Sequence, residues 1–228
     1  MIEPETWSIL HVMDTRLLRA NNPASPLIVL NTFGNEGEAV HAAVRSASKR
    51  DFSLLVVSGM DWNRDLSPWE ATAVFKNDAP FGGKADEFLD IIEKQAIPDA
   101  VSELGNRPEF IAIAGYSLAG LFAIYSLYMT DVFSRAASAS GSFWFPGFID
   151  FSASHEFIKK PEKLYLSLGE QEARTRNPVM ATVQENTEKL AELYRGRGID
   201  TTFELNPGNH FKDPAIRMAK GIRSILET

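Results

Sequence analysis

Short, continuously apolar segments alternate along the chain with longer segments whose apolar positions recur every three to four residues. The continuous segments predict β-strands that are buried on both faces, as in a parallel sheet. We expect such strands at residues 7–13, 26–33, 53–59, 110–115, 135–140, 163–169 and 201–206.

Helical patterns fill the intervals between these strands. We expect helices at residues 37–48, 84–101, 118–129, 177–198 and 213–227, the second of them bent or interrupted at Pro98. The alternation predicts an α/β fold with helices on both faces of a mostly parallel sheet. No repeat or long Gly/Ser/Pro linker divides the 228 residues, so we expect one domain spanning 1–228.

The composition narrows the functional classes. The net charge of −7 argues against a general nucleic-acid binder or a protein that binds anionic membranes. The chain has no cysteine, which excludes disulfides and thiolate metal sites. No segment has the length of about 18 apolar residues that a membrane span needs. No basic region precedes an apolar core near residue 1, so we expect no secretory signal and a cytoplasmic protein.

Ser117 lies between the predicted strand at 110–115 and the predicted helix at 118–129, within "GYSLAG". A serine on such a turn can present its hydroxyl above the carboxyl edge of the sheet, where the helix N-terminus favours negative charge. The usual pattern is G-x-S-x-G, and here Ala119 occupies the place of the second glycine. Ser117 is therefore a candidate nucleophile, and a simple helix-capping serine is the alternative.

His210 is the candidate base, because it follows the last predicted strand, in "ELNPGNHFKDP". This loop belongs to the same sheet edge as Ser117, and histidine comes last in the chain order of α/β-hydrolases. A carboxylate that orients the imidazole would lie between them, and we favour Glu172, because a turn after Gly169 could bring it back toward His210. Glu170 and a Ser–His dyad without an acid remain alternatives.

The remaining candidates concern binding of the oxyanion and the substrate. We expect the backbone N–H groups of Leu118 and of Phe33 or Gly34 to form the oxyanion hole. Other side chains follow strands at the same edge, and the candidates for substrate binding are Trp62, Arg64, Trp144, Phe143, Arg174 and Arg176. The arginines would favour an anionic substrate, or they would be surface charges paired with acids. The aromatic side chains would line a pocket or pack on the core.

Five segments occur in an order that resembles a known family: "GMDWNRDLSPWEAT", "FGGKADEFLDIIEKQAIPDAV", "GYSLAGLFA", "SASGSFWFPGF" and "NPGNHF". From about Leu27 to the C-terminus, the chain resembles the esterase D-like family of α/β-hydrolases, and within it the branch of ferric-siderophore (enterobactin-type) esterases. The resemblance implies a serine esterase with no metal or organic cofactor, with Ser117 as nucleophile and His210 as base. Glutamate replaces the more usual aspartate at the acid position.

We therefore expect a serine carboxylic-ester hydrolase that acts on small-molecule esters, among them siderophore-like ones. An acyltransferase, a peptidase or a thioesterase would use the same nucleophile. A binding scaffold without turnover is the non-enzymatic alternative. The oligomeric state is not predicted.

Overall fold

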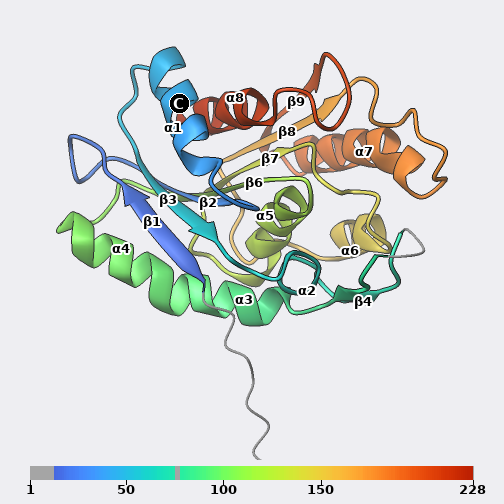
Figure 1. The fold of residues 1–228 in the computed structure, drawn as a ribbon, viewed down its shortest axis with the longest axis horizontal. Helices are drawn as coiled ribbons and strands as arrows, with labels where there is room; N and C mark the ends of the chain where they lie inside the picture. Colours follow the sequence, from blue (N-terminus) through green and yellow to red (C-terminus); the bar gives the residue numbers. More distant parts are fainter. Residues whose placement is uncertain (1–12, 75–77, 228) are drawn as a thin grey trace, which may run out of the picture.

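A seven-stranded sheet forms the centre of the computed structural model, which describes residues 13–74 and 78–227 (Figure 1). The strand order is β1-β3-β2-β6-β7-β8-β9, and all neighbours pair in parallel except β1 and β3. The strands are β1 (Asp14–Leu18), β2 (Leu27–Asn31), β3 (Ser53–Ser58), β6 (Ile111–Tyr116), β7 (Arg135–Ala139), β8 (Lys163–Gly169) and β9 (Asp200–Asn206).

Helices cover both faces of this sheet, as the alternating pattern predicted (Figure 1). The helices that fall in the predicted segments are α1 (Gly37–Ala47), α3 (Ala85–Ile91), α4 (Ile97–Leu104), α5 (Leu118–Met129), α7 (Val183–Gly196) and α8 (Pro214–Leu226). The predicted α/β fold with a mostly parallel sheet is thereby confirmed. The helix expected at 84–101 is divided by a π-helical turn at Ile92–Ala96, just before Pro98, which has no N–H to continue the regular ladder.

Alternate side chains of each strand enter two separate cores. Ile28 and Leu30 of β2 pack on the face that α1 and α8 cover, with Val44 and Ile222 among the buried contacts. Val29 belongs to the opposite core, together with residues of α3, α5 and α7. Residues of α5 are buried nearly all round its axis, so this helix is fixed in the core directly behind its N-terminus.

Several elements were not expected from the sequence. The strand predicted at 7–13 lies outside the described residues except for Met13, and the antiparallel edge strand at this side is β1. Two further helices, α2 (Trp62–Asp65) and α6 (Phe148–Ser154), lie in segments for which no helix was predicted. A two-stranded antiparallel ribbon, β4 (Glu70–Ala71) and β5 (Phe81–Gly82), lies between α2 and α3 in the chain.

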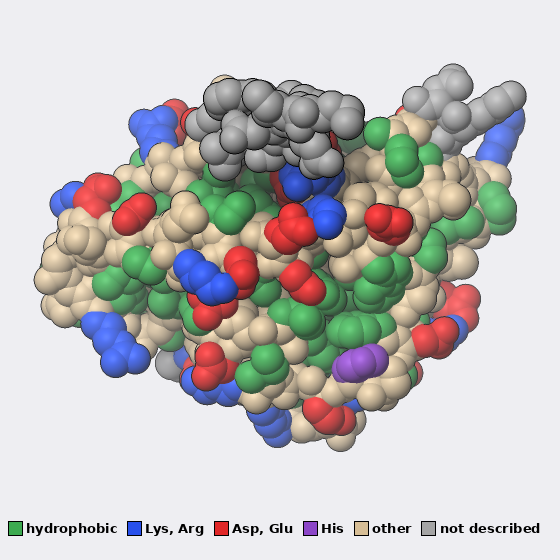
Figure 2. All heavy atoms as spheres, turned by 90° about the horizontal axis from the view of Figure 1, so that it is seen from below, with side chains coloured by type: hydrophobic (Ala, Val, Ile, Leu, Met, Phe, Trp, Pro, Cys, Tyr) green, Lys and Arg blue, Asp and Glu red, His purple; other side chains and the backbone are tan. Residues whose placement is uncertain are grey.

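Charged side chains of both signs are interspersed over the face drawn in Figure 2. Pairs such as Lys84–Glu87 and Lys94–Asp90, with N–O distances of 2.8 and 2.7 Å, neutralise neighbouring charges along α3 and the π-helical turn. Exposed pairs of this kind contribute little to stability. Among the residues that the structure describes, no helix has the length and apolar character that crossing a membrane would require.

Candidate active site

Ser117 sits on a strained turn between the end of β6 and the start of α5. Its backbone has φ 59° and ψ −123°, a conformation that residues other than glycine rarely adopt. Two hydrogen bonds hold it there: Ser117 N–H donates to the Ala139 carbonyl at 3.1 Å, and Ser142 N–H donates to the Ser117 carbonyl at 3.1 Å. The turn is thus tied to the segment after β7 and lifts the hydroxyl above the sheet edge.

Glycine is required on the strand side of this turn because backbone atoms approach closely. A β-carbon on Gly115 would lie 2.2 Å from the Ala119 carbonyl oxygen. A β-carbon on Gly120, on the helix side, would lie 2.6 Å from the Ser138 hydroxyl oxygen. Ala119 itself is fully buried without such a clash, which explains why alanine is accepted where the usual pattern has glycine.

We expect Gly115→Ala to lower the free energy of unfolding by about 1–3 kcal/mol, because the added methyl group meets fixed backbone. Urea unfolding of both proteins measures the loss. Gly196→Ala is the matched control, since a β-carbon there meets nothing within 4 Å and φ is not positive. An equal loss in the two variants would contradict the close-approach explanation.

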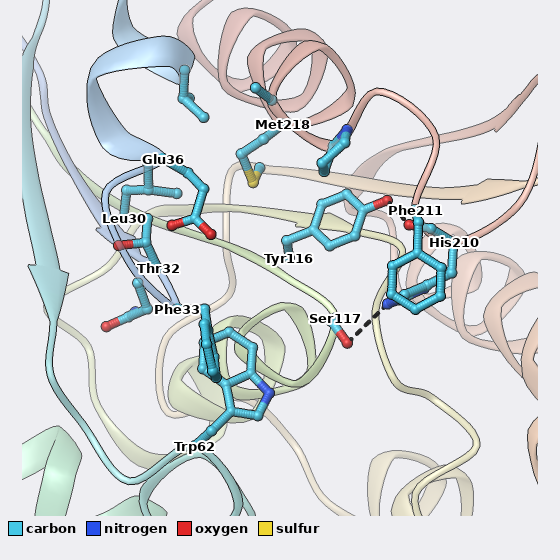
Figure 3. Close-up of a pocket in the computed structure, with 14 residues that line it drawn as sticks. Leu30, Thr32, Phe33, Glu36, Trp62, Tyr116, Ser117, His210, Phe211 and Met218 are labelled. Carbon is cyan, nitrogen blue, oxygen red and sulfur yellow. Dashed lines mark hydrogen bonds between the residues drawn. The ribbon is translucent and has the colours of Figure 1, made fainter.

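Three residues that are far apart in the sequence meet at this edge, as Figure 3 shows for Ser117 and His210. The distance from His210 Nε2 to Ser117 Oγ is 3.1 Å, and that from His210 Nδ1 to Glu172 Oε2 is 2.7 Å. The imidazole therefore bridges a hydroxyl and a carboxylate in one hydrogen-bonded series. A proton on Nδ1 would be held by Glu172 and leave Nε2 free to accept the serine proton.

Glu172 is held by a turn that brings it back under the histidine. Its N–H donates to the Gly169 carbonyl at 3.0 Å, while the Gly169 N–H donates to Glu172 Oε1 at 2.5 Å. The side chain is 4% exposed. Burial acts to raise the pKa of Glu172, but the hydrogen bond and charge of His210, helped by Gly169 and Ser140, outweigh it and leave the pKa below its ordinary value. The carboxylate is thus ionised at neutral pH.

Further polar groups support the carboxylate, and the sequence analysis did not identify them. Arg217 of α8 donates to Glu172 Oε1 at 3.1 Å, and Ser140 donates to the same oxygen at 2.7 Å. Tyr116 donates to the His210 carbonyl at 2.6 Å, which fixes the loop that carries the imidazole. One feature of the sequence could have indicated the role of Arg217: it is a basic residue on the apolar face of the α8 pattern. No feature of the sequence indicated that Ser140 or Tyr116 would support the site.

The predicted oxyanion donors differ in whether their N–H groups already donate a hydrogen bond within the protein. Within the described residues, neither the Phe33 N–H nor the Leu118 N–H has a hydrogen-bond acceptor. The Gly34 N–H instead donates to Glu36 Oε2 at 2.8 Å. Thr32 Oγ1 donates to the Gly34 carbonyl at 2.9 Å, so side chains occupy both polar backbone groups of Gly34. Leu118 and Phe33 therefore remain the candidate donors.

Two cavities open on either side of Ser117. The larger, about 290 Å³, is lined by Ser117, His210, Phe33, Trp62 and residues of β2, α1 and α8. The smaller, about 160 Å³, is lined by Ser117, Leu118, Ser142, Trp62, Trp144 and neighbouring residues. Trp62 and Ser117 belong to both linings, so the nucleophile stands at the point where the cavities meet.

Of the other candidates for substrate binding, one lines a cavity and the rest do not. Trp144 lines the smaller cavity, whereas Phe143 is fully buried in the core. Arg64 lines neither of these cavities and pairs with Asp65 and Glu87, at 3.0 and 3.6 Å. Arg174, Arg176 and Glu170 are exposed and also lie outside both linings.

The part of the chain that the structure describes contains no group of three or more His, Asp or Glu residues arranged to hold a metal ion. The acid, base and hydroxyl of the site are all supplied by side chains. This arrangement of side chains can activate a hydroxyl for attack on an acyl carbon.

Known proteins resemble this chain in sequence and in fold. The protein YbbA of Bacillus subtilis, itself uncharacterized, is 22% identical over 73% of this chain and 68% of its own. An IroE-like serine hydrolase from Shewanella oneidensis superposes with a TM-score of 0.76 at 18% identity, covering 94% of this chain and 75% of that one. The siderophore hydrolase EstB of Aspergillus nidulans superposes with a TM-score of 0.70 at 18% identity, covering 98% and 97%.

These solved structures share the fold, and solved siderophore and enterobactin esterases are among the neighbours. The family is shown by sequence: the model of the family described as "Putative esterase" matches residues 29–213. That range contains the turn at Ser117, the carboxylate Glu172 and the loop of His210. The chain therefore belongs to this esterase family, and it shares its α/β fold with the serine hydrolase from Shewanella oneidensis.

Proposed function

We propose that the protein is a serine carboxylic-ester hydrolase in which Ser117 is the nucleophile, His210 the general base and Glu172 the orienting acid. The observation that carries the proposal is the unbroken hydrogen-bonded series from Glu172 through His210 to Ser117, with distances of 2.7 and 3.1 Å. Membership in an esterase family supports the same chemistry.

In the first half of the reaction, His210 Nε2 takes the hydroxyl proton as Ser117 Oγ attacks the ester carbonyl carbon. The carbonyl oxygen becomes an oxyanion, which the N–H groups of Leu118 and Phe33 stabilise by hydrogen bonds. The protonated imidazole then gives its proton to the alcohol oxygen, the carbon–oxygen bond breaks, and the acyl group stays on Ser117.

In the second half, His210 removes a proton from water as the water oxygen attacks the acyl carbon. The imidazolium then returns this proton to Ser117 Oγ, the bond between Oγ and the acyl carbon breaks, and the acid leaves. Throughout, the negative charge of Glu172 favours the imidazolium form and holds the Nδ1 proton. Arg217 and Ser140 keep the carboxylate in position but touch no reacting atom. An alcohol in place of water would make the same site an acyltransferase.

A fluorophosphonate probe tests the proposal directly, since it bonds only to an activated serine. We expect stoichiometric labelling that mass spectrometry of peptides locates at Ser117, together with Ser117-dependent hydrolysis of 4-nitrophenyl acetate. Protein denatured in urea is the control and should not react. Labelling elsewhere, or none, would contradict the proposal, as it would for an inactive scaffold. Adding an acceptor alcohol and measuring transester product separates acyl transfer from hydrolysis.

A further inference from the structure

We propose that the preferred substrates are uncharged esters that join a bulky apolar alcohol to a small acyl group. This inference rests on the proposed esterase function and specifies the substrate for the same site. It is carried by the positions of the two cavities relative to His210, by the side chains that line them and by the charges on their walls.

The position of His210 distinguishes the two cavities. When the acyl-enzyme forms, the proton on Nε2 must pass to the oxygen of the departing alcohol, so the alcohol lies on the histidine side of Ser117. His210 lines the larger cavity and does not line the smaller one. Of the two proposed oxyanion donors, Leu118 lines the smaller cavity and Phe33 the larger, so the oxyanion hole lies between them and His210 alone separates the two sides. The geometry therefore places the alcohol group in the larger cavity and the acyl group in the smaller.

Apolar side chains make up most of the wall of the larger cavity, which is open at its rim. Leu30, Val40 and Met218 form its inner wall, and Trp62 packs edge-on against Phe33 with ring centroids 5.4 Å apart. Phe33 and Phe211 are 74% and 84% exposed, and they lie on opposite sides of Ser117 (Figure 3). Large exposed aromatic side chains beside a cavity mark a binding surface for apolar groups. A bulky hydrocarbon or aromatic alcohol group would cover both rings.

The smaller cavity has less room for the acyl group than the larger cavity has for the alcohol group. At about 160 Å³ it has roughly half the volume of the larger one, and Phe81 and Trp144, which pack together with centroids 6.0 Å apart, form part of its wall. Ser142 and Asn63 contribute polar groups. A short acyl group fits this space with Ser117 at its entrance, whereas a long or branched one would displace the aromatic wall.

The charges on the cavity walls disfavour anionic substrates. Glu36 is the acidic group of the larger cavity and Asp78 that of the smaller, and among the described lining residues there is no lysine or arginine. A carboxylate on the substrate would face like charge in a partly desolvated space. The anionic substrate considered in the sequence analysis required Arg64, Arg174 or Arg176 at the site, and none of them lines these cavities.

Two isomeric esters test the assignment of the cavities. In 2-phenylethyl acetate the phenyl group is on the alcohol, and in methyl 3-phenylpropanoate it is on the acyl side. After correction for their rates with hydroxide, we expect kcat/KM to favour the acetate by about 10–30-fold, the range that burial of an apolar group provides. Ala215→Phe, which narrows the larger cavity, should reduce this ratio at least about threefold. Equal rates, or a preference for the methyl ester, would overturn the assignment.

A third ester tests the charge argument. We expect kcat/KM for 2-(4-carboxyphenyl)ethyl acetate to be about tenfold below that for the neutral acetate, and Glu36→Gln to narrow the gap about threefold. Glutamine retains an oxygen that can accept the Gly34 N–H. An anionic ester that reacts as fast as the neutral one would overturn the charge argument.

Hydrolysis of 4-nitrophenyl acetate is the reference for both tests. If this hydrolysis is present and depends on Ser117, a reversed substrate preference overturns the substrate inference alone. If it is absent, the proposed function fails together with the substrate inference.

Discussion

Ser117→Ala is expected to lower kcat/KM for ester hydrolysis by about 10⁴–10⁶-fold while leaving the fold intact. Among the described residues, the Ser117 hydroxyl is the oxygen that forms a hydrogen bond with His210 Nε2, at 3.1 Å, and without it no acyl-enzyme can form. Initial rates with 4-nitrophenyl acetate measure the loss, and circular dichroism checks the fold. Because nucleophile and base act as a unit, a double variant of Ser117 and His210, each changed to Ala, should be scarcely slower than either single one.

Ser142→Ala is the matched control, because it makes the same substitution beside the nucleophile. Ser142 is buried, and its Oγ lies 3.4 Å from Ser117 Oγ. The hydrogen-bond partners of the His210 ring among the described residues are Ser117 and Glu172. We expect this variant to retain activity within about tenfold of the parent, as for a side chain that lines the acyl cavity. If Ser142→Ala were as inactive as Ser117→Ala, or if Ser117→Ala kept near-normal turnover, the assignment of the nucleophile would be wrong.

The sequence was sufficient to predict the strands buried on both faces. β2, β6 and β8 are continuous apolar runs between turn residues, and their pattern admits few alternatives. β1 escaped prediction because, among the described strands, it lies at the edge beside β3 and carries charged residues on its exposed side. α6 escaped because an aromatic segment with Pro146 and Gly147 at its start reads as a loop, although Phe148 begins a helical turn.

The candidate site was likewise predicted only in part. Ser117 and His210 could be proposed from chain order and turn residues, because parallel strands bring their carboxyl ends to one edge. Their 3.1 Å separation agrees with that expectation. Cavity walls depend on how distant side chains pack, so the sequence left open whether Arg64 binds substrate or pairs with acids. In the structure it pairs with Asp65 and Glu87. The support from Arg217 depends on the exact face that α8 turns toward β8, which periodicity alone does not fix.

Arg217→Met should destabilise the protein by about 3–5 kcal/mol, the second large effect that we expect. The Arg217 side chain is 3% exposed and that of Glu172 is 4% exposed, so the ion pair is buried. Arg217 also donates to the Pro207 carbonyl at 2.9 Å, on the loop that leads to His210. Its removal would leave a buried carboxylate without its cation and that carbonyl without a donor. Urea unfolding monitored by circular dichroism gives the loss.

The same substitution at Arg19, whose pair with Glu103 is exposed, is the control and should cost no more than about 1 kcal/mol. A double variant, Glu172→Gln with Arg217→Met, separates the charge from the packing. Since it removes both buried charges and keeps an acceptor for the Gly169 N–H, it should recover most of the stability that Arg217→Met loses, yet stay slow in ester hydrolysis because His210 lacks its carboxylate. A double variant as unstable as the sum of the two single ones would show that Arg217 stabilises the loop by packing rather than by compensating the charge of Glu172.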